Sequence, residues 1–301
     1  MKNILLLLFL LLVISHGGAN NVDSLITSSK SLLKKGAYLD ALKLISLAKE
    51  ECKKDSDQIC LAKVYMVYSN INMKVSKYSD AIQELLYAQK IAIAEDNKPL
   101  IAKTYNDLAV LYFETADNRE DYINKAESNI KIAYKILKEN NIHDNEIILN
   151  YGVIVYMYNN PDAALSFFLK EKKIIDVNDH VDHVYINDYI AHIYKNLLNY
   201  KKSLEYHYRS LYFSKKDKNI SLESMNYANI AYSYFMLNYT DSAFVLANKS
   251  YKLAVTTNNK YAMELSIDVL CDIYYKQNNI KLYRKYILIA DSIKKSHTHQ
   301  R

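Results

Sequence analysis

The chain has 301 residues, half of them hydrophobic, and its 39 Lys and Arg against 33 Asp and Glu give a net charge of +6. It holds only four glycines and two prolines, far below the average usage of roughly 7% and 5%. Hairpins and tight loops take their special backbone dihedrals mostly from these two residues, so the composition excludes turn-rich β architectures. We expect long helices joined by short polar links, with the 29 tyrosines supplying much of the packing.

The N-terminus has the pattern of a secretory signal peptide at residues 1–19. Met1-Lys2-Asn3 precedes an uninterrupted apolar run from Ile4 to Ile14, and small residues follow at Gly17 and Ala19. The run is too short for a membrane-spanning helix, which needs about 20 residues. No cysteine follows it as the acceptor that a bacterial lipoprotein signal would need. We expect cleavage after Ala19, export to the periplasm or the extracellular space, and no membrane insertion of the mature chain.

Export would place the three cysteines in an oxidising compartment. Cys52 and Cys60 lie eight positions apart across a polar link, where a disulfide could join two neighbouring helix ends. The bridge requires Cα atoms within about 7 Å, so the sequence leaves it open. Cys271 occupies a position that holds Ser, Ala or Gly elsewhere in the chain, which indicates a small buried residue.

A repeat of about 40 residues runs through the rest of the chain, from residue 20 to 295. The first marker of each unit is a small residue, and the markers are separated by 40, 40, 43, 39, 40 and 40 positions: Ser29, Ser69, Ala109, Gly152, Ala191, Ala231 and Cys271. A second marker follows 12 positions later in all units but the third: Ala41, Ala81, Ala126, Ala164, Ser203, Ala243 and Tyr283. Apolar residues around both markers recur at helical spacing. We therefore predict seven stacked helical hairpins whose helices cross at the small residues.

Three departures from regularity carry structural expectations. The third unit has five extra residues within 114–122, which predicts a longer loop between its two helices. The first unit has few aromatic residues and the chain ends in a polar segment, 296–301, which together provide the polar caps that a solenoid needs.

These units resemble tetratricopeptide repeats. Leu108-Ala109-x-x-Tyr112, Ile190-Ala191-x-x-Tyr194 and Ile230-Ala231-x-x-Tyr234 look like the L-G-x-x-Y of that family, and Tyr38-x-x-Ala41 and Tyr78-x-x-Ala81 resemble its second helix. The period is longer than the family's 34 residues and the terminal proline is missing. The resemblance implies an all-α, right-handed superhelical solenoid of about seven hairpins.

Enzyme motifs are excluded by the glycine count, because only Gly36 and Gly152 follow the signal peptide. Phosphate-binding loops and the nucleophile elbow need glycines at short spacing, and neither C-x-x-C nor H-E-x-x-H occurs. Asp179-His180-x-Asp182-His183, with His192, has residue types that bind metals. We interpret it as a solvated helix start whose acids complement the helix dipole. We expect no enzyme, no cofactor and no metal site.

Nucleic acid is not expected as a partner either. The lysine pairs are spread along the chain near predicted helix ends, where they complement the dipole: Lys53-Lys54, Lys172-Lys173, Lys215-Lys216 and Lys294-Lys295. A phosphate-binding stripe would need them to converge with aromatic residues between them.

A protein or peptide ligand is the expected partner, because in this family the first helices line a concave groove that binds peptides. Counting from the first markers predicts a mixed groove of apolar, amide, acidic and histidine side chains: Met66, Asn70, Asn106, Phe113, Tyr156, Asp188, His192, Tyr232, Phe235, Asp268, Asp272 and Tyr275. Packing between adjacent repeats is the alternative role for each of Phe113, Tyr156 and Phe235.

Two functions fit this pattern. The first is an exported, non-catalytic scaffold that binds a protein or peptide in the groove. The second rests on a resemblance to the extracytoplasmic repeat region of bacterial membrane-anchored signalling regulators, which implies a sensor. The sequence leaves the ligand and the oligomeric state open.

Overall fold

The computed structural model describes residues 19–34, 36–117, 119–157, 160–176 and 178–298. These residues form fourteen α-helices and one π-helix, without a strand, which confirms the predicted all-α class. In chain order they are α2 (Ala19–Lys34), α3 (Tyr38–Lys54), α4 (Gln58–Lys74), α5 (Tyr78–Ala94), α6 (Lys98–Glu114), α7 (Glu120–Asn140), α8 (Asn145–Tyr151), η1 (Gly152–Met157), α9 (Pro161–Glu171), α10 (His180–Asn196), α11 (Tyr200–Lys216), α12 (Ile220–Met236), α13 (Thr240–Thr257), α14 (Lys260–Lys276) and α15 (Ile280–Thr298). No described helix has the length and apolarity needed to span a bilayer.

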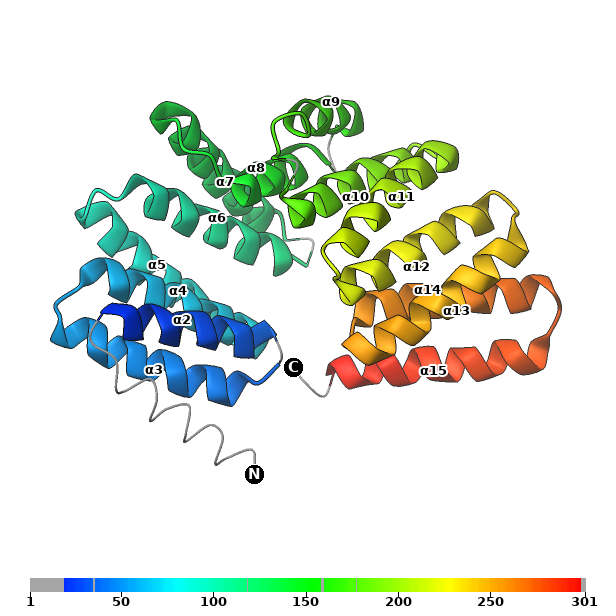
Figure 1. Cartoon of the computed structure of the whole chain (residues 1–301), viewed down its shortest axis with the longest axis horizontal. Helices are drawn as coiled ribbons and strands as arrows, with labels where there is room; N and C mark the ends of the chain where they lie inside the picture. Colours follow the sequence, from blue (N-terminus) through cyan, green and yellow to red (C-terminus); the bar gives the residue numbers. More distant parts are fainter. Residues whose placement is uncertain (1–18, 35, 118, 158–159, 177, 299–301) are drawn as a thin grey trace. The chain divides into compact units, whose positions relative to one another are not determined.

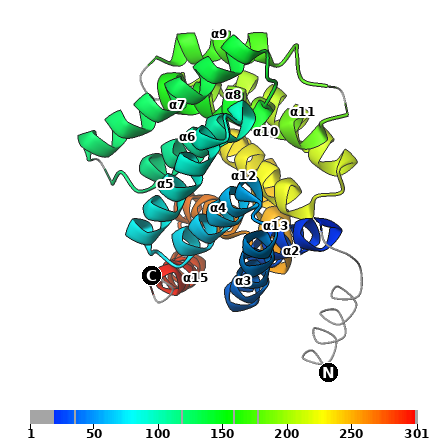
Figure 2. The ribbon, with the colours of Figure 1, turned by 90° about the vertical axis from the view of Figure 1, so that its left-hand side faces the viewer.

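Consecutive helices pair into hairpins, as the repeat predicts (Figures 1 and 2). We call α2, α4, α6, α8, α10, α12 and α14 the first helices, and their partners the second helices. The chain divides into two compact units: unit 1 covers residues 1–147 and unit 2 covers 148–301. Within each unit a hairpin also packs against the next one along the chain, for example α3 against α4 and α11 against α12. Each unit thus buries the helix stripes that a single hairpin would leave exposed.

The 40-residue period consists of two helices, each followed by a short link. Most helices have 17 residues and most links between them have three. The middle residue of these links has a positive φ, as in Ser56 (φ 53°) and Ser76 (φ 60°). This left-handed residue ends the helix with paired backbone bonds, such as Ser56 N to Lys53 O and Asp57 N to Cys52 O. Because Ser, Asp and Asn fill this position in most links, the fold needs few glycines.

Asparagine at the link's last position starts the next helix. The side-chain oxygens of Asn97, Asn199, Asn219, Asn259 and Asn279 each accept a bond from the backbone N–H three residues on. This is the N-cap geometry that satisfies one of a helix's free donors.

The small markers lie where the two helices of a hairpin cross. Ser29 and Ala41 are both fully buried, and Ser29 Oγ donates to the Ala41 carbonyl at 2.8 Å across the first hairpin. Gly152 is the tightest of these positions, because a Cβ placed there would lie 2.6 Å from the Phe168 ring. The markers therefore set how closely the helices approach.

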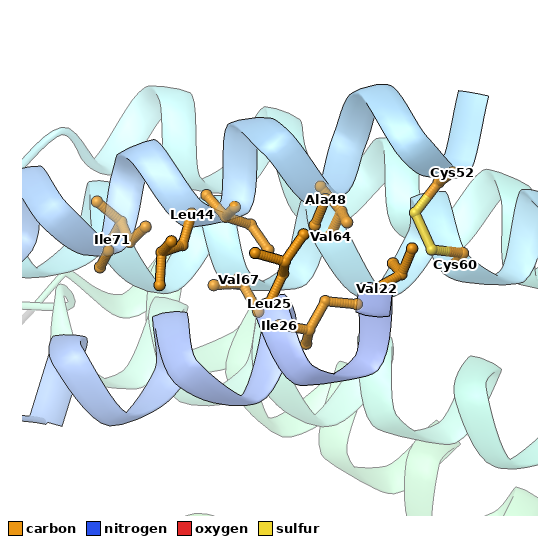
Figure 3. Close-up of a cluster of buried hydrophobic side chains, with 12 residues drawn as sticks. Val22, Leu25, Ile26, Leu44, Ala48, Cys52, Cys60, Val64, Val67 and Ile71 are labelled. Atoms are coloured by element: carbon orange, nitrogen blue, oxygen red, sulfur yellow. A yellow bond between two sulfur atoms is a disulfide. The ribbon is translucent and has the colours of Figure 1, made fainter. Parts of the chain in front are cut away.

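Cys52 and Cys60 form a disulfide with Cα atoms 5.6 Å apart. It joins the C-terminal end of α3 to the N-terminal end of α4 (Figure 3). It lies at one end of the apolar core that these helices share with α2, next to Val22 (Figure 3). Cys271 is a free, buried cysteine.

Two boundaries differ from the expected ones. The link after α6 has only two more residues than the usual three, while α7 has 21 residues instead of 17. Most of the insertion in the third unit therefore lengthens a helix, not the loop. The last helix continues to Thr298, beyond the boundary expected at 295. The predicted signal sequence lies outside the described residues, apart from Ala19.

Candidate functional site

Unit 1 contains a pocket of about 490 Å³ whose wall comes almost entirely from first helices. Side chains from α2, α4, α6 and α8 face it, so four successive hairpins contribute. Its lining consists of Lys30, Leu33, Lys63, Met66, Val67, Ser69, Asn70, Met73, Leu85, Leu100, Lys103, Asp107, Val110, Leu111 and Glu146. We call this the first-helix pocket.

The first-helix pocket combines apolar side chains with lysines. Leu33, Met66, Met73 and Val110 are buried or half-buried and provide adaptable apolar contact. Lys30 and Lys63 are exposed along the same lining. Asn70 is half-buried among them and can hold a backbone amide group of a ligand.

A third lysine is held by two acids of the chain. Lys103 Nζ lies 2.5 Å from Glu146 Oε2 and 3.9 Å from Asp107 Oδ1. Burial lowers the pKa of Lys103, but the two carboxylates outweigh burial and raise it. Burial raises the pKa of Asp107 to about 6, and the more distant Lys103 offsets this only in part. At pH 7 Lys103 balances one of the two carboxylates, and Lys30 and Lys63 outweigh the other, so the lining is positive overall.

The predicted groove residues of unit 1 fall in three environments. Met66 and Asn70 line the first-helix pocket. Asn106 is fully buried beside it, and its Nδ2 donates to Asp107 Oδ1 at 3.0 Å and to Glu146 Oε1 at 3.4 Å. Phe113 is half-buried on α6 outside the lining. Of these four predicted residues, two line the first-helix pocket, one is buried beside it and one lies outside its lining.

Sequence reasoning missed the charged part of this pocket. Lys63, Lys103 and Glu146 each lie six positions before the small marker of their unit, one helical turn before the predicted groove positions. Charged residues at this same position in three successive units were the sequence signal that could have revealed the charged part of the pocket.

Unit 2 holds a buried polar network around Asp188. Asn229 Nδ2 donates to Asp188 Oδ1 at 3.2 Å, and Tyr261 Oη donates to Asn229 Oδ1 at 2.9 Å. His192 Nε2 lies 3.4 Å from Asp188 Oδ2, and His207 Nδ1 lies 3.3 Å from Oδ1. Helices α10, α11 and α12 are linked through this one carboxylate, and α14 joins them through the bond from Tyr261 to Asn229.

The network favours an ionised Asp188. Burial opposes ionisation, but the attraction and hydrogen bonding of His192 and His207 outweigh it and hold the pKa of Asp188 well below its usual range. Burial also lowers the pKa of His207, despite the nearby carboxylate. Asp188 is 7% exposed and His207 is fully buried, so these groups stabilise the packing of the first helices more than they offer a surface to a ligand.

Tyr232 and Phe235 are partly core residues. Both are half-buried against the cluster of Ala231, Ala243 and Val269. Lys195 Nζ lies 5.5 Å from the Tyr232 ring centroid, and Lys276 Nζ lies 5.8 Å from that of Phe235. Replacing either ring would remove packing as well as surface.

The other predicted groove residues of unit 2 are dispersed. Asp268, Asp272 and Tyr275 are exposed on α14, and Tyr275 is 68% exposed. Burial and the neighbouring Asp268 raise the pKa of Asp272. Tyr156 lies in η1 within an aromatic cluster with Tyr151 and Phe167.

His180 and His183 lie against an aromatic ring. Their rings are 6.1 and 4.4 Å from Phe213, and His183 stacks on it. Burial lowers the pKa of His183. This arrangement is packing at the start of α10.

No family model matches the chain, and no curated protein matches it. Solved structures share its fold. A Rap conjugation gene regulator of plasmid pLS20, in complex with the Phr* peptide, has a TM-score of 0.69 and 10% identity over 93% of this chain and 75% of that one. The apo form of RapI has a TM-score of 0.67 and 13% identity over 92% of this chain and 99% of that one.

A third similar structure is a STAND protein with a tetratricopeptide repeat sensor from Pyrococcus horikoshii, with a TM-score of 0.66 and 20% identity over 91% of this chain. The matched region is 41% of that protein's length. The fold is therefore that of tetratricopeptide-repeat helical solenoids, as the repeat motifs implied.

Proposed function

We propose that the protein is a non-catalytic binding protein that captures a protein or peptide segment in the first-helix pocket. The observation that carries this proposal is the lining itself, in which first helices of four successive hairpins converge on one pocket of about 490 Å³. A pocket built across repeats suits a chain segment better than a compact metabolite, because successive helices offer successive contacts.

The lining favours a segment with both apolar and acidic side chains. Met66 and Met73 adapt to varied apolar groups, while Lys30 and Lys63 attract carboxylates. A peptide is also bound in the Rap regulator structure of similar fold, which supports this class of ligand.

Export to the periplasm or the extracellular space is part of the proposal. The apolar run at residues 4–14 with small residues at Gly17 and Ala19 supports it. The Cys52–Cys60 disulfide also supports it, since such bonds persist in oxidising compartments.

A sensory role within a signalling regulator is the second candidate. It is supported by the repeat sensor of the STAND protein that shares the fold. A sensor would bind a free peptide, whereas a scaffold would bind the same type of segment as part of a folded protein.

The test is a selection of short peptides from a random library on the immobilised chain, followed by affinity measurement by fluorescence anisotropy. We expect the selected peptides to be enriched in acidic and apolar residues. Lys63→Glu should weaken binding roughly tenfold or more, because it sets like charges together. Asn70→Ala should weaken it by about two- to tenfold, the range of one hydrogen bond.

Lys90→Glu is the matched control, because Lys90 is an exposed lysine on α5 outside the pocket lining. It makes the same change of charge and should leave the affinity unchanged at moderate salt. Equal losses for Lys63→Glu and Lys90→Glu would contradict binding in the first-helix pocket.

A further inference from the structure

A second cavity lies on a different part of unit 2. It has a volume of about 390 Å³ and is lined by Tyr208, Tyr234, Asp241, Ser242, Val245 and Leu246. These residues come from the second helices α11 and α13 and from the C-terminal part of α12. None of them belongs to the first-helix pocket, and we call this cavity the tyrosine pocket.

Two aromatic rings form adjacent walls of the tyrosine pocket. The Tyr208 and Tyr234 rings have centroids 6.5 Å apart and planes at 75°, and their hydroxyl oxygens are 3.0 Å apart. Tyr239 packs edge-on against Tyr234, with centroids 5.9 Å apart and planes at 86°. These contacts fix the two walls nearly at right angles, so a group placed between them can contact both.

The remaining walls are one carboxylate, one hydroxyl and two aliphatic side chains. Asp241 and Ser242 are exposed in the first turn of α13. Val245 is 63% exposed one turn further along. Asp241 complements the helix dipole, but within the described part of the chain it makes no ion pair with a lysine or arginine.

The chain's own cations cover other tyrosines of unit 2. Lysine or arginine groups lie between 4.3 and 5.7 Å from the ring centroids of Tyr206, Tyr212, Tyr227 and Tyr232. Among the described residues, no lysine or arginine lies over Tyr208 or Tyr234. The tyrosine pocket is thus lined by two tyrosine rings and a carboxylate, and no lysine or arginine of the described chain lies over either ring or pairs with Asp241.

We propose that the tyrosine pocket binds an alkylammonium group. Ring faces attract ammonium and quaternary ammonium cations, and the carboxylate adds charge complementarity while the aliphatic wall contacts the alkyl groups. A lysine side chain of a polypeptide and a free choline-like molecule share this chemistry. The site is independent of the first-helix pocket.

The first test is a titration with choline and with its uncharged isostere 3,3-dimethylbutan-1-ol, followed by NMR of the tyrosine rings. Choline should shift the Tyr208 and Tyr234 ring signals saturably, and the isostere should bind at least several-fold more weakly because only the charge differs. Equal binding of the two would overturn the proposal.

Substitutions of single residues test whether choline binds in the tyrosine pocket. Tyr208→Ala should weaken choline binding by about two- to fivefold, the factor that an exposed cation–π contact provides. Asp241→Asn should weaken it by up to about fivefold, the factor that an exposed ion pair provides. Tyr208→Phe keeps the ring and should retain binding. Tyr212→Ala is the matched control, because Tyr212 is a 54% exposed tyrosine on the same helix with Lys216 over its ring. If Tyr212→Ala weakened binding as much as Tyr208→Ala, the proposal would fail.

Two further ligands distinguish a polypeptide lysine from a choline-type molecule as the source of the cation. They are an acetylated and amidated Ala-Lys-Ala tripeptide and the same peptide with trimethyllysine. Binding of the unmodified tripeptide as tight as that of choline would identify a polypeptide lysine as the ligand group. Binding of only the two quaternary ligands would identify a methylated or choline-type group. No saturable shift with any of these cations would overturn the proposal.

Discussion

Leu198, in the link between α10 and α11, holds a backbone conformation that asparagine adopts at the same position of later links. Its φ is 57° and its side chain is 72% exposed, so little packing offsets the strain. Asn238, Asn258 and Asn278 have the equivalent left-handed conformation. Asparagine is favoured over leucine there because its short polar side chain can hydrogen-bond to the nearby backbone.

Leu198→Asn should therefore raise the free energy of unfolding by about 0.5 to 1 kcal/mol, measured by urea denaturation. Leu198→Ala is the control, because it removes the exposed leucine side chain without adding the amide that stabilises the left-handed conformation. Equal effects of the two substitutions would show that backbone strain at Leu198 is not the cause.

Asp107 links stability to pH. The folded state binds its proton more tightly than the unfolded chain, because burial raises its pKa from 3.8 to about 6. The stability that Asp107 contributes is thus present below its unfolded pKa and is lost as pH rises from about 4 to about 6. Asp107→Asn removes this loss of stability, because asparagine does not ionise.

We compare the change in unfolding free energy that Asp107→Asn causes at pH 7 and at pH 4. This change should favour the variant by about 1 to 3 kcal/mol more at pH 7 than at pH 4. The measurement is denaturant unfolding of both proteins at the two pH values. The exposed Asp217 provides the control variant, Asp217→Asn. A difference between wild type and Asp107→Asn that is the same at both pH values would contradict the assignment.

At the scale of the elements, the crossing at Gly152 tests whether small residues set helix spacing. A methyl group at Gly152 would meet Phe168 Cζ at 2.6 Å and Phe167 Cδ1 at 2.9 Å, and Phe168 is fully buried. Gly152→Ala should lower the free energy of unfolding by about 1 to 3 kcal/mol through overpacking. The double variant Gly152→Ala/Phe168→Leu should cost less than the sum of the single changes, as measured by a double-mutant cycle. Stabilisation by Gly152→Ala, as helix propensity alone would give, would refute the close crossing.

The disulfide between α3 and α4 is a second feature of the helices whose contribution to stability can be measured. It closes a loop of eight positions between α3 and α4, so its removal in Cys52→Ala/Cys60→Ala should cost about 2 to 3 kcal/mol. Thermal unfolding with and without a reductant measures this. Reductant should destabilise the wild type and leave the double variant unchanged; a wild type indifferent to reductant would contradict a stabilising bridge.

The elements were predictable because their signals are local and repeated. Small residues such as Ala109 and Ala191 recur near 40-residue steps and mark crossings that permit no larger side chain. The left-handed links were not predictable, since Ser, Asp and even Leu198 stand where glycine would be the usual signal. The lengthening of α7 was missed because an inserted polar stretch is compatible with either a loop or an amphipathic helix.

At the scale of the whole molecule, the sequence predicted a groove face, and the structure adds contacts between hairpins that the sequence did not predict. The marker register placed Met66 and Asn70 in the first-helix pocket, yet the grouping of Lys103, Asp107 and Glu146 depends on contacts between different hairpins. The same holds for Asp188 and Asn229, which are 41 positions apart and hydrogen-bonded. Such contacts follow from the offset between stacked hairpins, which periodicity does not determine.

We propose that the first helices of unit 1 bind a polypeptide segment. The most direct measurement is site-specific photo-crosslinking with p-benzoylphenylalanine at Asn70, in the pocket, and at Tyr87, which is 55% exposed on the second helix α5. We expect the selected acidic and apolar peptide to be crosslinked from position 70 and not from position 87, and excess unlabelled peptide to suppress the product. Crosslinking from position 87 with none from position 70 would contradict it.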